Sequence, residues 1–89
     1  MGFKVQMLKE AVVELHVAEC YFASKNLSDD FLKDFAKQLQ FLKTTPHSFQ
    51  VKYRGIRILN FEQFNYSIHY QVNGKKVVIY RILNQRQNF

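Results

Sequence analysis

The most regular pattern in the sequence is QFNYSIHYQVNG, residues 63–74. One alternate set of its positions is large and apolar, and the other set is polar. This period of two predicts a strand with one face in a core and one face outside it. Asn73-Gly74 is typical of a two-residue hairpin turn, so a return strand is expected over residues 75–84. The apolar set is Phe64, Tyr66, Ile68, Tyr70 and Val72, and the polar set is Asn65, Ser67, His69, Gln71 and Asn73.

The preceding residues supply the layer that covers this strand. Residues 3–8 alternate as a short strand. In residues 9–25 and again in residues 31–43, apolar side chains recur at steps of three and four, which predicts two amphipathic helices. Residues 51–62 are interpreted as one extended segment, with Gly55 as a bulge or entry point. The predicted class is α+β in the order β-α-α-β-β-β, with an N-terminal helical hairpin packed on a small antiparallel sheet.

Length and composition bound the class of protein. A chain of 89 residues forms one domain, residues 1–89, and 47% hydrophobic residues exclude disorder. There is no apolar run of the ~18 residues that a transmembrane helix needs, and the start lacks the apolar region of a secretory signal. The single Cys20 cannot form an internal disulfide, so the cytoplasm is the expected compartment.

The net charge of +6 is confined to one half of the chain. Residues 1–45 hold six lysines and six acids, whereas residues 46–89 hold three lysines and all four arginines against Glu62 alone. We therefore expect the second half to attract a polyanion or an acidic protein surface. The alternative is a solvated basic face that only keeps the protein soluble.

The residues suited to chemistry also lie in the second half. The three histidines show no metal-ligand spacing and there is no Gly-rich phosphate loop, so no metal or cofactor is expected. His69, Tyr53 and Ser67 are accompanied there by Arg54, Arg57, Arg81 and Arg86. Such a group suits stabilising phosphoryl charge during attack by a hydroxyl. It equally suits contacts to a nucleic-acid backbone or salt bridges to an acidic peptide.

The order of segments and three short motifs resemble the RelE/ParE superfamily of bacterial toxins, and most closely its ParE-like, plasmid-stabilisation branch. The family pattern runs Y-x-x-I-R, then F-P-Y-x-I-x-Y, a turn, an apolar strand and H-x-x-R-N-P. The matching residues are Tyr53, Ile56 and Arg57, then Phe64, Tyr66, Ile68 and Tyr70, and finally Leu83, Arg86 and Asn88. The chain departs from the pattern at Asn65, Asn84 and Phe89, where Pro, His and Pro are usual.

This resemblance implies a toxin of a type II toxin–antitoxin system, whose partner is a small antitoxin laid on the helical hairpin and sheet. Two mechanisms occur in the superfamily: ParE-like members poison DNA gyrase, and RelE-like members cleave mRNA in the ribosomal A site. In the ribonuclease branch an arginine that neutralises the scissile phosphate usually stands where this chain has Ser67. The loss of that arginine, and of the histidine at Asn84, favours the gyrase-directed interpretation.

Three hypotheses follow from the resemblance. The chain is a growth-inhibiting toxin that binds a target of the gyrase type, a ribosome-dependent mRNA endonuclease, or an inactive relic that only binds its antitoxin. The candidate catalytic residues are His69, Arg86 and Arg57. The candidate target-binding and antitoxin-binding residues are Arg54, Arg57, Arg81, Arg86, Ser67 and Asn84. Dimerisation through the helical hairpin is a further expectation, since an uncovered apolar stripe on a small domain invites a partner.

Overall fold

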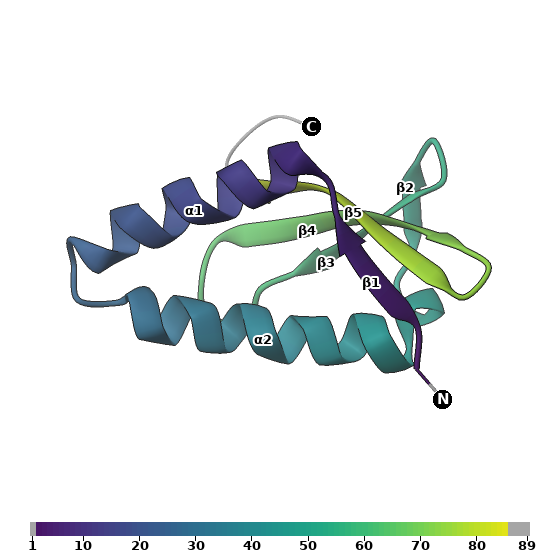
Figure 1. Cartoon of the computed structure of the whole chain (residues 1–89), viewed down its shortest axis with the longest axis horizontal. Coiled ribbons are helices and arrows are strands. Elements are labelled where there is room, and N and C mark those ends of the chain that lie inside the picture. Colours follow the sequence, from purple (N-terminus) through teal and green to yellow (C-terminus); the bar gives the residue numbers. More distant parts are fainter. Residues whose placement is uncertain (1, 86–89) are drawn as a thin grey trace.

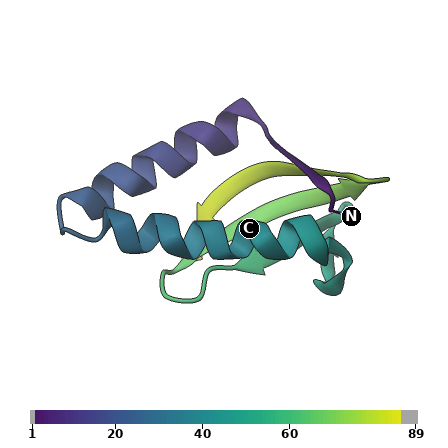
Figure 2. The same ribbon diagram turned by 60° about the horizontal axis from the view of Figure 1, so that its bottom comes forward.

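The computed structural model describes residues 2–85 and places two helices on one side of a single sheet (Figures 1 and 2). The helices are α1 (Lys9–Ala23) and α2 (Ser28–Thr44), and the short 3-10 helix η1 (Pro46–Ser48) follows them. The strands are β1 (Lys4–Met7), β2 (Val51–Tyr53), β3 (Ile56–Asn60), β4 (Tyr66–Asn73) and β5 (Lys76–Asn84). The α+β class and the covering helical hairpin are confirmed. Neither helix is long and apolar enough to cross a membrane.

The sheet has the order β1-β5-β4-β3-β2. The strands β2 to β5 form an antiparallel meander of four strands, where the sequence predicts three. The first strand departs from the expected antiparallel sheet, because β1 runs parallel to β5 in a register from Lys4 opposite Lys76 to Met7 opposite Ile79. Parallel neighbours need a long connection, and here nearly the whole chain lies between them.

Residues 51–62 are not one extended segment. They form a tight hairpin of β2 and β3 whose two turn residues, Arg54 and Gly55, have φ of 47° and 76°. Two positive φ values in a two-residue loop are the geometry of a type I′ turn. The β4–β5 hairpin is confirmed, but its turn residues are Gly74 and Lys75, one position later than expected. Gly74, with φ of 61°, takes the first turn position, where a type II′ turn requires glycine.

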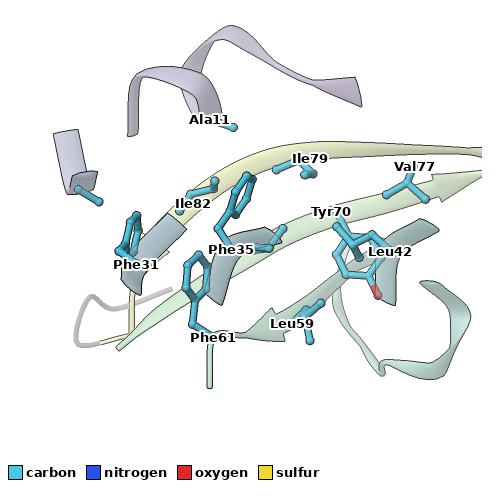
Figure 3. Close-up of a cluster of buried hydrophobic side chains, with 12 residues drawn as sticks. Ala11, Phe31, Phe35, Leu42, Leu59, Phe61, Tyr70, Val77, Ile79 and Ile82 are labelled. Carbon is cyan, nitrogen blue, oxygen red and sulfur yellow. The ribbon is translucent and has the colours of Figure 1, made fainter. Parts of the chain in front are cut away.

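The core lies between the helices and the sheet (Figure 3). Phe31 of α2 stacks on Phe61 with ring centroids 5.2 Å apart, and Ile68 and Tyr70 present the apolar side of β4 to it. The hydroxyl of Tyr70 donates to the carbonyl of Pro46 at 2.6 Å, and burial raises its pKa to about 12. The apolar set of the opening stretch therefore packs as the sequence predicts.

Asp34 fastens the loop between β3 and β4 to α2. Its carboxylate is buried and accepts from the backbone N–H groups of Glu62 and Gln63, at 3.1 and 2.7 Å. The side chain of Gln38, one turn further along α2, donates to it at 2.9 Å. Charge-assisted bonds of this kind are about twice as strong as neutral ones. They fix the point at which β4 begins, and hence the register of its polar face.

Candidate functional site

The polar set of β4 lies on the sheet face away from the helices, which we call the open face. Ser67 and His69 alternate with Ile68 and Tyr70, whose side chains are in the core. Neighbouring strands add the side chains that sit opposite them in the ladder, namely Asn60 beside Ser67, and Ile58 and Arg81 beside His69. The strand thus places the predicted residues on the predicted face.

Ser67 and His69 are nevertheless buried, both with 0% exposure, so the expectation of an accessible polar row is wrong at these two positions. The reason is the β2–β3 hairpin, which sequence reasoning missed. It brings Tyr53 over the sheet, and the phenol oxygen of Tyr53 lies 2.8 Å from Nδ1 of His69. Ser67 donates to the side-chain oxygen of Asn60 at 2.8 Å. The open face is thus closed at its centre by its own strands.

The imidazole of His69 is held in its neutral form. Burial lowers its pKa, and the guanidinium of Arg81 lowers it further, against a smaller opposite effect of Glu14. A neutral imidazole has a basic nitrogen, so the side chain is chemically able to accept a proton. General-base catalysis also requires a substrate within hydrogen-bond reach, and Tyr53 occupies the position at Nδ1.

The predicted arginine group does not assemble on the open face. Arg57 lies opposite Tyr70 and therefore projects to the helix side, where it donates to the backbone carbonyl of Phe49 at 2.5 Å. Arg81 remains beside His69, but its guanidinium is paired with the carboxylate of Glu14, with Nε 2.8 Å from Oε2. Arg54 sits exposed in the β2–β3 turn.

Two further predicted residues lie near the C-terminal end of the chain. Asn84 is half-buried at the end of β5, opposite Tyr66. Arg86 lies outside the described residues. The catalytic and binding roles assigned to the arginines, His69, Ser67 and Asn84 stay predictions.

Beside the buried centre, the open face carries a shallow pocket of about 460 Å³, which we call the open-face pocket. Its floor combines an aromatic ring, an aliphatic side chain, amides and one lysine. These side chains could contact a polar group of a partner, but they do not indicate a particular reaction. The lining residues are Lys52, Tyr53, Ile58, Asn60, Ser67 and Gln85. Within residues 2–85, no group of three or more His, Cys, Asp and Glu side chains could hold a metal ion.

A second surface lies between α1 and the edge of β5, and we call it the α1–β5 groove. Because β1 pairs with β5 only as far as Ile79, the following backbone of β5 has a strand beside it only on its β4 side. Glu14 covers part of this edge, since its Oε1 accepts from the N–H of Ile82 at 2.9 Å. Pockets of about 150 and 470 Å³ follow one another along the groove and share Tyr66 and Asn84.

The exposed side of α1 beside this groove is apolar. Val13, Val17 and Tyr21 follow at intervals of four, and their side chains are 52%, 64% and 55% exposed. Leu27, in the loop between α1 and α2, is a further exposed apolar side chain beside the groove. The periodicity of α1 was predicted, but this second apolar stripe went unrecognised because the helix is apolar on more than its core face.

The family model of the ParE toxin of type II toxin–antitoxin systems, parDE, matches residues 8–89. The chain belongs to the ParE toxin family. Membership confirms the predicted family and implies a cognate antitoxin as partner. Comparison with curated protein sequences gives no match.

The fold is also that of a solved ParDE structure, described as the chromosomal ParDE TA system from P. aeruginosa. The two chains superpose with a TM-score of 0.76 at 20% sequence identity. The alignment covers 92% of this chain and 95% of the other. At 20% identity this similarity supports the fold alone. The family assignment rests on the family model that matches residues 8–89.

Proposed function

We propose that this ParE toxin arrests growth in the cytoplasm by binding a large target of the DNA gyrase type, and that its antitoxin neutralises it at the α1–β5 groove. Family membership supports the toxin role. The observation that carries the choice of mechanism is the closed centre of the open face. His69 is buried and covered by Tyr53, and Ser67 stands where a charge-stabilising arginine would be needed.

Electrostatics also disfavour an mRNA-cleaving site. Phosphoryl transfer relies on cations placed to stabilise charge that develops in the transition state, and removing one such group costs about 10²–10³ in rate. In this chain Arg57 bonds to a backbone carbonyl on the helix side, and Arg81 is paired with Glu14. Neither guanidinium is placed beside a reachable base. Binding to a macromolecular target does not require cations placed beside a catalytic base.

The gyrase proposal is tested with purified toxin, gyrase, ATP and supercoiled plasmid. We expect linear plasmid to accumulate after protein is removed from the reaction, because a poisoned gyrase holds a cleaved DNA intermediate. Primer extension on translated mRNA serves as the parallel measurement. Unchanged gyrase products together with discrete cuts in ribosome-bound mRNA would reject the proposal in favour of the ribonuclease.

The antitoxin surface is supported by the exposed apolar stripe on α1. Amphipathic segments bind by laying apolar side chains into such a groove at helical spacing. A lysine at Val17 would put a charge at the middle of the stripe without touching the core, since Val17 is 64% exposed. Ala36→Lys, on the exposed side of α2, is the matched control.

Co-expression with the antitoxin encoded beside the toxin gene tests whether the antitoxin binds at the α1–β5 groove. We expect the antitoxin to rescue growth of cells that express the wild type or Ala36→Lys, and to fail against Val17→Lys. Full rescue of Val17→Lys would place the neutralising contact elsewhere. Growth arrest by each variant alone shows that the toxin still folds and acts.

A further inference from the structure

One end of the sheet carries exposed positive charge and no carboxylates. Lys4 at the start of β1, Lys75 in the β4–β5 turn, Lys76 at the start of β5 and Arg54 in the β2–β3 turn are all exposed. We call these four residues the cationic end. Strand pairing places Lys4 directly opposite Lys76. Figure 1 shows the two hairpin turns and the start of β1 at the same end of the molecule.

The β2–β3 turn is held close to β4 by direct packing. A Cβ built on Gly55 would lie 3.1 Å from Nε2 of Gln71, so the turn with Arg54 sits against the last part of β4. The β4–β5 turn, in contrast, projects into solvent, since a Cβ on Gly74 would meet nothing within 4 Å. The four cations therefore come from three segments that are far apart in sequence and lie at one end of the sheet, with β1 and β2 at its two edges.

No acid balances this charge locally. The five strands and their two hairpin turns contain no Asp or Glu. The acids of the described chain lie on α1, on the first half of α2, and at Glu62 in the loop after β3. Among residues 2–85, the ion pairs are His16–Glu19, Lys37–Glu62 and Arg81–Glu14, and none involves the cationic end.

The arrangement is unfavourable for the free protein. Like charges directly opposite one another on neighbouring strands are destabilising. Lys4 and Lys76 form such a pair, and Lys75 adjoins Lys76 in the β4–β5 turn. A bound polyanion would relieve this repulsion, and the positive potential would speed its encounter with the toxin.

The surroundings favour a phosphate backbone over an acidic protein. Interfaces between proteins depend on aromatic or aliphatic anchors in pockets. The large exposed apolar side chains lie instead on α1, α2, β2, the α1–α2 loop and Leu8 between β1 and α1, and β1, β4 and β5 contribute none. Asn73 lies opposite Lys76 and Gln6 is two residues from Lys4, and amides beside Lys and Arg are typical phosphate contacts.

We propose that the cationic end binds the phosphate backbone of duplex DNA without reading its sequence. This inference rests on the proposed function, because the duplex in question is the DNA that the gyrase-type target holds. The toxin would thus engage its target and the DNA with different parts of its surface. The affinity should be in the range of non-specific DNA binding, where Kd is about 10⁻⁴–10⁻⁶ M at physiological salt.

The test measures fluorescence anisotropy of a short labelled duplex with purified toxin and no gyrase, at several salt concentrations. Each neutralised phosphate contributes about −0.9 to the slope of log K against log salt, so four contacts give about −3.6. Lys75→Gln/Lys76→Gln should reduce the slope by about 1.8 and weaken binding more than about tenfold. Lys25→Gln/Lys33→Gln removes the same charge from the helical layer and should leave slope and affinity nearly unchanged.

Several outcomes would overturn the proposal. Equal losses in the two double variants would show an effect of net charge alone. Tighter binding of single-stranded RNA of the same length would assign the surface to RNA, and equal or tighter binding of a polyglutamate peptide would assign it to an acidic protein. The gyrase assay separates this inference from the proposed function. Gyrase poisoning without DNA binding rejects only the cationic end, and DNA binding without gyrase poisoning rejects only the target.

Discussion

The two faces of β4 reach the same depth of burial by different routes. Ile68 and Tyr70 are covered by two helices, which close a core of aromatic and branched side chains. Ser67 and His69 are equally inaccessible, but they are covered by other parts of the sheet and by a three-residue strand that carries Tyr53. The first face is closed by extensive packing, and the second by the short β2–β3 hairpin, whose Tyr53 hydroxyl lies 2.8 Å from Nδ1 of His69. Closure of the open face should therefore be the weaker of the two.

The largest expected effect comes from deleting the same atoms on each face. Ile68→Ala removes a fully buried side chain under the helices and should destabilise the toxin by about 2–5 kcal/mol. Ile58→Ala, on the partly buried open face, should lose less than half as much, because fewer neighbours surround the side chain. Urea unfolding gives both values. Equal losses would mean that the open face is packed as well as the core.

A smaller effect is expected from the bond that closes the open face. Tyr53→Phe removes only the hydroxyl that meets Nδ1 of His69, and should destabilise the toxin by about 0.5–1.5 kcal/mol. Tyr80→Phe is the matched control, since its hydroxyl donates to Gln71 on the same face at 3.0 Å. Only Tyr53→Phe should move the imidazole resonances of His69 in an NMR spectrum. Unmoved resonances would show that Tyr53 does not contact the imidazole in solution.

The pH dependence of stability should report the burial of His69. Its pKa is lowered in the folded toxin from the ordinary 6.5, so below pH 6.5 the unfolded chain takes up a proton that the folded toxin refuses. Stability is therefore full above pH 6.5 and is lost as the pH falls toward the folded pKa. Urea midpoints at a series of pH values should fall less steeply for His69→Gln. Parallel profiles would indicate that His69 is solvated.

The smallest effect is expected at the rim of the open face. The guanidinium of Arg81 and the carboxylate of Glu14 are 45% and 22% exposed, and ion pairs of this kind contribute about 0–1 kcal/mol. Arg81→Gln should lie within that range. Glu14→Ala should destabilise the toxin more, because it also removes the acceptor of the Ile82 N–H. A larger loss for Arg81→Gln would mean that the arginine supports the closure over His69.

The sequence predicts the helix-covered face well, because period and composition determine it locally. Phe64, Tyr66, Ile68 and Tyr70 alternate along one strand, and two helical stripes supply what covers them. The state of the open face depends on a hairpin that the sequence signals only weakly. Arg54-Gly55 is not among the common type I′ pairs, so the positive φ of Arg54 and the return of Tyr53 over His69 could not be expected.

Other features of the site were missed for similar reasons. Asp34 and Gln38 fall on the core stripe of α2 between Phe31, Phe35 and Leu42, and a polar pair at spacing i, i+4 inside an apolar stripe could have indicated a buried anchor. The separation of Arg57 from Arg81 follows from strand register. One residue more or less in the β3–β4 loop would have placed Arg57 on the open face.

The central claim is that the open face serves as a covered surface and that the toxin acts by binding. The most direct measurement is growth arrest by His69→Gln, expressed without antitoxin and confirmed as folded by circular dichroism. We predict that this variant arrests growth as the wild type does, since the buried imidazole takes no part in target binding. Loss of growth arrest in a folded and normally stable His69→Gln toxin would contradict this prediction and assign His69 a part in the toxic activity.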